Sequence, residues 1–120
     1  VYFEARGEPL AGQFAVAQVV LNRVADSRYP DNICDVVFQN EDWRHRCQFS
    51  FACDGRSDQP AETRAWLMAR TVAAFAALEC ARHTAGAATH YHAVYVRPGW
   101  ADRLQRTAKL GRHVFYREGY

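Results

Sequence analysis

The strongest constraint on the fold of this 120-residue chain is a run of apolar residues at helical spacing near its start. Between Pro9 and about Ala25, apolar side chains recur every three or four residues, at Leu10, Phe14, Ala17, Leu21 and Val24, with Val16, Val19 and Val20 widening the same face. That spacing is typical of an amphipathic helix. Pro9 suits its first turn, and Gly7 allows a sharp bend before it. We therefore predict a helix that ends within residues 2–6, a turn, and then a long helix.

A second long helix is predicted from about Pro60 to Arg82. Asp58 can cap its start, and Pro60 fits its first turn. Small and apolar residues form one stripe along it, at Trp66, Ala69, Val72, Ala73, Ala76 and Cys80. Because alanine lets two helices approach closely, we expect this helix to pack against the first.

The last third of the chain has the composition of strands. Residues 89–96 are rich in β-branched and aromatic side chains, which predicts a strand. We expect a short helix over residues 100–110, stopped by Gly111, and a second strand over residues 113–116 that pairs with the first. The predicted fold is α+β and mainly helical, with a small antiparallel sheet, and the length fits a single domain over residues 1–120.

The middle of the chain combines an irregular segment with most of the cysteines. Residues 39–59 are polar and aromatic without a period, so we predict an ordered loop there. Four cysteines in a small domain favour disulfides and an oxidising compartment. Cys47 and Cys53 could close a short loop and leave Cys34 to pair with Cys80, but the sequence allows all three pairings.

The sequence carries no secretory signal peptide and no apolar run of membrane-spanning length. It begins at Val1 in the middle of an apolar pattern, so we expect a domain cut from a longer, exported chain. The net charge is +2, and fourteen of the fifteen basic residues are arginine. These residues are scattered rather than gathered in runs, so we expect no nucleic-acid partner.

Glu4 is the first candidate for catalysis. It lies among apolar neighbours, where loss of hydration favours a protonated carboxyl group. Such a group can donate a proton to a glycosidic oxygen. The alternative is a structural ion pair with Arg6 or Arg23, and the local spacing alone favours that alternative.

Glu8 is the obvious second carboxylate, and glycosidases often use two acids. It precedes Pro9 at the start of a predicted helix, where negative charge is favourable. We therefore expect Glu8 to be a turn or capping residue rather than to act on a substrate.

Metal and nucleophile chemistry have weaker support. His90 and His92 would share one face of a strand. Further possible ligands are His45, Cys47, Cys53 and His113. Their spacing fits no known zinc pattern, so we expect no metal and no cofactor. Ser50 lacks a glycine elbow, and a Cys47–His90 protease lacks a supporting signature.

Several blocks of the sequence, taken together and in order, carry a family resemblance. They are Tyr2-Phe3-Glu4-Ala5-Arg6-Gly7-Glu8-Pro9, Gly12-Gln13, Val19-Val20-Leu21-Asn22-Arg23-Val24, Tyr29-Pro30, Cys34-Asp35-Val36-Val37, Cys47-Gln48-Phe49-Ser50-Phe51, Cys53-Asp54-Gly55, Ala88-Thr89-His90-Tyr91-His92-Ala93, Pro98, Trp100-Ala101 and Gly111-Arg112-His113-Val114-Phe115-Tyr116. The chain resembles the SleB/CwlJ-type cell wall hydrolases, the family of spore-cortex-lytic enzymes.

The resemblance implies a lysozyme-like, lytic-transglycosylase-like fold, in which a helical lobe and a small antiparallel sheet flank a groove. It implies cleavage of peptidoglycan between N-acetylmuramic acid and N-acetylglucosamine, with Glu4 as the catalytic glutamate. The substrate-binding positions it implies are Gln48, Ser50, Thr89, His90, Tyr91 and Tyr116.

The expected reaction uses Glu4 first as acid and then as base, so that the muramyl 6-hydroxyl closes a 1,6-anhydro ring. A hydrolytic muramidase, a non-catalytic peptidoglycan-binding module, and a cysteine- or zinc-dependent amidase or peptidase are the alternatives. The expected partner is the peptidoglycan glycan strand, bound by a monomer exported to the periplasm, the envelope or the medium, or carried by a phage as a lysin.

Overall fold

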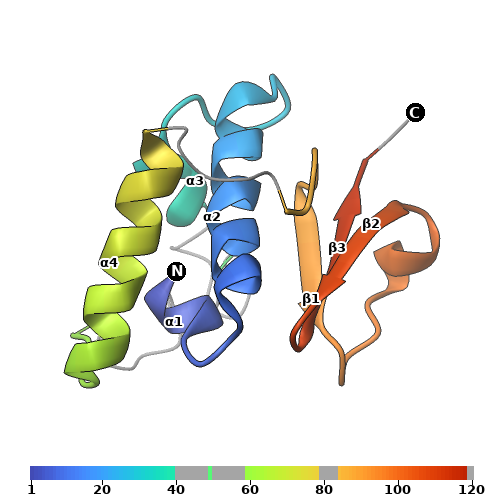
Figure 1. The fold of residues 1–120 in the computed structure, drawn as a ribbon. Coiled ribbons are helices and arrows are strands. Elements are labelled where there is room, and N and C mark those ends of the chain that lie inside the picture. Colours follow the sequence, from blue (N-terminus) through green and yellow to red (C-terminus); the bar gives the residue numbers. More distant parts are fainter. Residues whose placement is uncertain (40–48, 50–58, 79–83, 119–120) are drawn as a thin grey trace.

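The computed structural model describes residues 1–39, 49, 59–78 and 84–118. Within these residues the α-helices form one side of the molecule and the sheet forms the other, with α2 lying between α4 and the sheet (Figure 1). The helices are α1 (Tyr2–Ala5), α2 (Leu10–Ala25), α3 (Ile33–Val37) and α4 (Thr63–Ala77). The strands are β1 (His90–Ala93), β2 (Gln105–Leu110) and β3 (His113–Arg117), and the 3-10 helix η2 (Gly99–Asp102) follows β1.

The central helix α2 is buried on two sides, and this explains its wide apolar face. Toward α4 it places Ala17 against Val72 and Ala76. Toward the sheet it places Val16 and Val19 in a core. The other members of that core are Ala5, Ala15, Ala85, Ala88 and Phe115. Phe115 of β3 is fully buried there, and burying a ring of this size stabilises the fold by about 2–3 kcal/mol.

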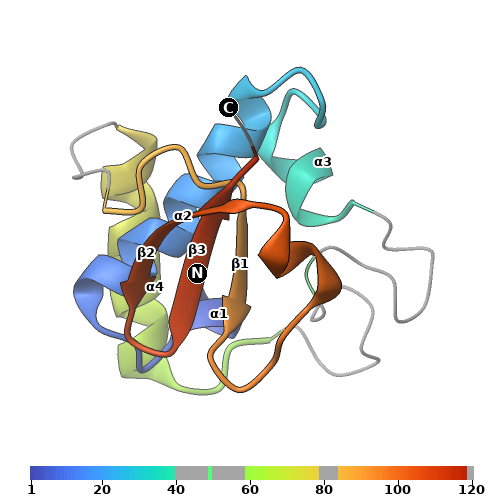
Figure 2. The same cartoon turned by 90° about the vertical axis from the view of Figure 1, so that its right-hand side faces the viewer.

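Among the described strands the order is β1-β3-β2, so β3 is central and β1 and β2 are the edge strands. Both pairings are antiparallel, which confirms the predicted pairing of the two strands that the sequence indicated. Tyr91 lies opposite Phe115, so both side chains point toward α2. His90 lies opposite Tyr116, on the other face. Figure 2 shows β1 at one edge of the sheet and η2 on the face turned away from the helices.

The predicted helix over residues 100–110 is wrong. That segment forms η2 and then β2, which pairs with β3 through a tight turn at Gly111. Gly111 has a φ of +59°, which suits a hairpin turn as well as a helix end. The ladder to β3 provides backbone partners that a short, exposed helix lacks, so tertiary pairing decides the outcome.

The second long helix is confirmed between Thr63 and Ala77, but it does not begin at Pro60. The hydroxyl of Tyr2 accepts hydrogen bonds from the backbone N–H groups of Ala61 and Glu62, both at 3.0 Å. These contacts hold the chain against α1 before the helix starts.

The predicted apolar stripe of α4 is mostly right. Ala69, Val72 and Ala76 are buried, whereas Trp66 remains 37% exposed and contacts the Tyr2 ring. The predicted cap, Asp58, and the predicted end near Arg82 lie outside the described residues.

Helix α3 was not expected from the sequence. Its start is capped by Asn32, whose side chain accepts a hydrogen bond from the backbone N–H of Asp35 at 2.9 Å. Five residues are too few to give a helical period. Cys34 in this helix is exposed and has a free thiol, so a Cys34–Cys80 bond is not present.

The other three cysteines and most of the predicted loop over residues 39–59 lie outside the described residues. Within the part of the chain that the structure describes, no helix is both long enough and apolar enough to cross a membrane.

Candidate active site

A groove of about 560 Å³ runs along the edge strand β1, where the helical lobe meets the sheet. Its walls come from α1, α2, β1, the segment that leads into η2, and the start of β3. The lining residues are Phe3, Glu4, Arg23, Phe49, His90, Tyr91, His92, Ala93, Tyr95, Val96, Pro98, Trp100 and His113. Of these described residues, Glu4 is the only one with a carboxyl group.

Glu4 lies half-buried in α1, with its carboxyl group at the groove. The hydroxyl of Tyr91 donates a hydrogen bond of 2.5 Å to Glu4 Oε1. Tyr91 can reach α1 because the alternation of β1 turns its ring toward the helices. Its burial, the charge of Glu4 and this hydrogen bond together raise the pKa of Tyr91 well above its usual value. Tyr91 therefore stays a hydrogen-bond donor over the whole neutral pH range.

The alternative of a structural ion pair for Glu4 does not hold. Arg6 lies 3.8 Å from Glu62, and Arg23 donates to the backbone carbonyl of Thr89 at 2.8 Å. Within the described part of the chain, Glu4 has one hydrogen-bond partner, Tyr91, and forms no ion pair.

Glu8 stands in the bend between α1 and α2, as expected, but it does not cap α2, so that part of the expectation is wrong. Its carboxylate is buried and turns to the β2–β3 turn, where Arg112 donates to it through the backbone N–H at 2.6 Å and through Nε at 2.8 Å. Burial alone would raise the pKa of Glu8, but the hydrogen bonds and the charge of Arg112 outweigh burial and lower it, with a smaller contribution from His113 when its ring is protonated. Glu8 therefore fastens the helical lobe to the hairpin as a carboxylate.

Gly111 makes this fastening possible. A Cβ at this position would lie 2.6 Å from Glu8 Oε1 and 2.6 Å from Cδ of Pro9. Together with the positive φ, this close approach explains why a glycine stands in the turn.

His113 lies between the two glutamates. Its ring packs edge-on against Tyr91 at 5.1 Å, and its Nδ1 lies 3.8 Å from Glu8 Oε1 without forming a hydrogen bond. Burial lowers the pKa of His113, and the charges of Glu8 and Glu4 only partly oppose that effect. The histidine is therefore neutral at neutral pH.

The outer face of the sheet supplies an aromatic wall to the groove. Trp100 contacts His90, with ring centroids 5.0 Å apart, and His92, at 5.8 Å. Tyr116 stacks on His92 at 5.3 Å and donates to or accepts from its Nε2 at 2.9 Å. Rings of this kind provide flat surfaces against which the apolar face of a sugar can pack.

The residues expected from the sequence divide into three groups. Glu4, His90 and Tyr91 lie together in the groove. Thr89 and Tyr116 are buried behind its wall, where Thr89 contacts the His90 ring and Tyr116 supports His92. Gln48 and Ser50 lie outside the described residues.

Arg23 and Trp100 are among the groove residues that were not chosen as site residues from the sequence. Arg23 is buried beneath the groove, and its guanidinium lies over the rings of Tyr29 and Phe49 at 5.0 and 5.5 Å. Both residues stand in the sequence blocks that carry the family resemblance. Their membership of those blocks was the signal that could have identified them as site residues.

The zinc alternative is not supported by the sheet. His90 and His92 do share one face, as predicted, but His113 lies on the opposite face with Tyr91. Among the described residues, no group of three possible metal ligands is close enough to hold an ion. His45, Cys47 and Cys53 lie outside those residues.

Comparisons with known proteins agree with this arrangement. A family model described as cell wall hydrolase matches residues 7–116. A spore cortex-lytic enzyme of Halalkalibacterium halodurans is 34% identical over 116 residues, and one of Oceanobacillus iheyensis is 30% identical over 118. Each match covers 96% of this chain but 32% and 38% of the relative, so the chain spans about a third of their length.

Two solved structures share the fold. They are the catalytic domain of the germination-specific lytic transglycosylase SleB from Bacillus anthracis and that of the Bacillus cereus SleB protein. Each has a TM-score of 0.74 and 27% identity and covers 97% of this chain, which in turn covers 86% and 82% of those domains. The expected α+β fold with a helical lobe and a small sheet is confirmed. With a family match over most of its length, and relatives that share both sequence and fold, the chain belongs to the cell wall hydrolase family.

Proposed function

We propose that this domain cleaves peptidoglycan glycan strands between N-acetylmuramic acid and N-acetylglucosamine, as a lytic transglycosylase. One observation carries the proposal. Glu4 is the single carboxyl group among the described residues of a large groove, and it receives a hydrogen bond from Tyr91. The names of the related enzymes support the same substrate class.

In the first step Glu4, as a carboxylic acid, donates its proton to the glycosidic oxygen. The bond from that oxygen to the anomeric carbon of the muramyl residue then breaks, and positive charge develops on the sugar ring. The Tyr91 hydroxyl donates to Oε1 throughout, so it stabilises the carboxylate that forms while Oε2 carries the transferred proton.

In the second step the Glu4 carboxylate takes the proton of the muramyl 6-hydroxyl. The 6-oxygen forms a bond to the anomeric carbon and closes the 1,6-anhydro ring. The substrate supplies its own nucleophile, so a single carboxyl group is sufficient.

The count of carboxyl groups distinguishes this route from simple hydrolysis. Glycosidases that use water generally need a second carboxylate about 5–10 Å from the first. The nearest candidate in sequence, Glu8, is buried and bound to Arg112. A hydrolytic muramidase that uses Glu4 is the second candidate.

The test is digestion of purified sacculi, with the products identified by mass spectrometry. The wild-type domain should release fragments with 1,6-anhydromuramyl ends, and Glu4→Gln should lose activity by at least about 10³-fold with an unchanged melting temperature. Glu62→Gln is the matched control, since Glu62 is an exposed glutamate that pairs loosely with Arg6. Reducing muramic acid ends would indicate hydrolysis instead, and retained activity of Glu4→Gln would refute the catalytic role.

A further inference from the structure

A second, smaller pocket adjoins the groove beside Glu4. It has a volume of about 140 Å³ and a mostly polar lining. The residues that line it are Glu4, Arg6, Glu8, Ala93, Tyr95, Arg112 and His113. Glu4 and His113 belong to both the pocket and the groove, so a ligand in the groove can extend into the pocket.

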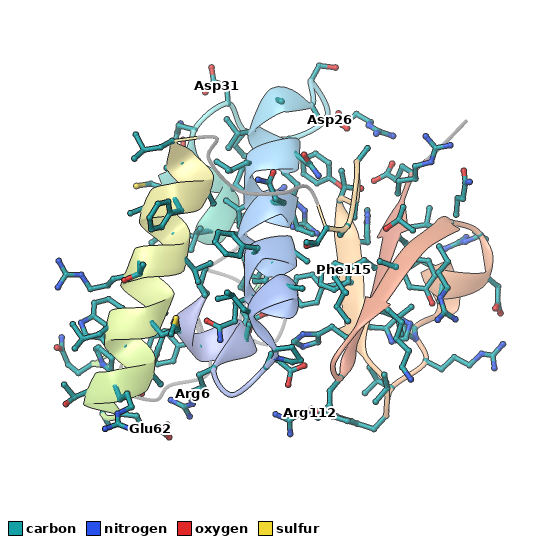
Figure 3. The ribbon with its side chains drawn as sticks, viewed as in Figure 1. Arg6, Asp26, Asp31, Glu62, Arg112 and Phe115 are labelled. Atoms are coloured by element: carbon teal, nitrogen blue, oxygen red, sulfur yellow. The ribbon has the colours of Figure 1, made fainter. Side chains whose placement is uncertain are left out.

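Two arginines approach this pocket from opposite sides. Arg6 comes from the end of α1 and Arg112 from the hairpin turn, and Figure 3 shows both at the same end of the molecule, one on the helical side and one on the sheet side. A Cβ placed on Gly7, the neighbour of Arg6, would lie 3.9 Å from Nη2 of Arg112. Arg6 and Arg112 therefore line the same pocket.

Neither arginine uses its terminal nitrogens in the contacts that hold it. Arg112 uses its Nε for Glu8, and its side chain is 68% exposed. The guanidinium of Arg6 lies over the Tyr2 ring at 4.8 Å, and its nearest acidic group is Glu62, 3.8 Å from its Nε. A guanidinium whose Nη groups are not engaged in this way presents a pair of donors that matches a carboxylate.

The charges in the pocket favour an anion. Arg6 and Arg112 contribute two positive charges, and Glu8 contributes one negative charge. Glu4 is neutral when it carries the proton that the proposed reaction requires, and His113 is neutral as well. The exposed Glu62 offsets Arg6 only weakly, because exposed pairs at this distance are well screened.

The position of the pocket specifies which carboxylate it can receive. If Glu4 acts at the muramyl bond, as proposed above, the sugar beside it carries a lactyl group on its 3-oxygen. That group ends either in its own carboxylate or in a peptide with carboxylates of its own. We infer that Arg6 and Arg112 form a subsite for a carboxylate carried by this muramyl substituent. This inference rests on the proposed function, because it assumes that the muramyl residue lies at Glu4.

Three forms of substrate test the subsite. The first is intact sacculi, and the second is glycan strands stripped of peptides by an amidase, which leaves free lactyl carboxylates. The third is the same stripped strands with those carboxylates capped as neutral methylamides. Arg6→Gln should raise KM by about fivefold on a carboxylate-bearing substrate, with kcat nearly unchanged, and should have no effect on the capped strands. Arg112→Lys also removes the Nε hydrogen bond to Glu8, so its rise in KM is compared between the charged and the capped strands at a temperature where the variant is folded.

The control is Arg106→Gln, which removes the same charge from an exposed position on β2, at the far edge of the sheet. An effect on sacculi alone identifies a peptide carboxylate as the ligand, and an effect on stripped strands identifies the lactyl carboxylate. An equal rise in KM on the capped strands, or an equal rise from Arg106→Gln, would overturn the subsite.

A separate measurement distinguishes failure of the subsite from failure of the proposed reaction. Co-sedimentation of the Glu4→Gln protein with each polymer reports binding without turnover. Arg6→Gln in that background should weaken binding to the carboxylate-bearing polymers and leave binding to the capped strands unchanged. Binding that is insensitive to the carboxylates would refute the subsite even if the enzyme releases anhydro ends.

Discussion

The region around Glu4 and the region around Glu8 use the same side chain for different purposes, although the two residues stand four positions apart. Glu4 lies at an open groove with one neutral donor, the Tyr91 hydroxyl. Glu8 is buried and receives two hydrogen bonds from Arg112. Two donors and a positive charge hold a carboxylate in its ionised form, whereas a single hydroxyl leaves the second oxygen free to exchange a proton.

The comparison teaches that the partners, rather than the local sequence, assign the roles. Tyr91 lies 87 positions after Glu4, and Arg112 lies 104 positions after Glu8. The hairpin of β2 and β3 therefore has two effects. Its strand β3 pairs with β1, which carries Tyr91, and its turn donates the Arg112 hydrogen bonds to Glu8. Substitutions that alter activity at Glu4 without altering stability at Glu8, or the reverse, test this comparison of the two glutamates.

The largest effects on activity and stability are expected from replacing Glu4 and Glu8, one at a time, with glutamine. Glu4→Gln should abolish turnover and keep the stability of the wild type. Glu8→Gln should keep the product pattern but lower the free energy of unfolding by about 2 kcal/mol, because an amide cannot accept both Arg112 donors. Urea denaturation and product analysis on both variants measure the two effects. The comparison fails if Glu8→Gln is as inactive as Glu4→Gln while remaining folded.

The next largest effect is a loss of stability when the contact between Glu8 and the β2–β3 turn is disturbed. Gly111→Ala should destabilise the domain by about 3 kcal/mol, since the positive φ and the contacts with Glu8 and Pro9 both oppose a Cβ. Gly86→Ala is a matched control, because Gly86 has a φ of +60° with nothing within 4 Å of a Cβ. The difference between the two melting temperatures isolates the cost of the close approach to Glu8. Equal losses would mean that the approach does not matter.

Much of the helical lobe could be predicted from the sequence, because its signals are local. The period in α2 and the small-residue stripe in α4 each lie within one element. The strand β2 could not be predicted in this way, since its polar residues fit a helix or a strand and the pairing with β3 decides between them. Glu8 was misassigned for the same reason, because its partner is distant in sequence.

The candidate site could be predicted only in part. The resemblance identified Glu4 and Tyr91, but their hydrogen bond depends on the register of β1 against β3. Thr89 was expected at the substrate, yet its side chain contacts His90 and its carbonyl accepts from Arg23. A motif indicates which residues gather near a groove, and the alternation of the strand decides which of them face it.

A smaller effect on activity is expected at Tyr91. Tyr91→Phe removes the hydroxyl that donates to Glu4 and leaves the ring in the core, so kcat should fall about tenfold with KM nearly unchanged. Tyr29→Phe makes the same chemical change elsewhere, since the Tyr29 hydroxyl donates to Glu118 at 2.8 Å, and it should stay near wild-type activity. Steady-state rates on sacculi measure both variants. Equal losses would show that the Tyr91 hydroxyl has no special role at Glu4.

The smallest expected effect is on the pH dependence of stability. It involves His113, which lies between the two regions and faces Glu4, Tyr91, Glu8, Arg112 and His92. Burial lowers its pKa in the folded state below the usual histidine value of 6.5, so the unfolded chain binds more protons just below pH 6.5. The stability linked to His113 is therefore present above pH 6.5 and is lost as the pH falls through the folded pKa. The wild type should melt at a lower temperature at pH 5.5 than at pH 7.5.

His113→Gln should reduce that difference, because glutamine does not titrate. His90→Gln is the matched variant, since burial also lowers the pKa of His90, and it should remove a separate share of the difference. The ring protons of His113, followed by NMR, should titrate with a midpoint below 6.5. A midpoint above 6.5 would mean that Glu8 attracts the histidine proton more strongly than burial opposes it. In that case the charge of Glu8 would keep a proton on His113, which lines the groove. Glu8 would then influence the site around Glu4 as well as the stability of the fold.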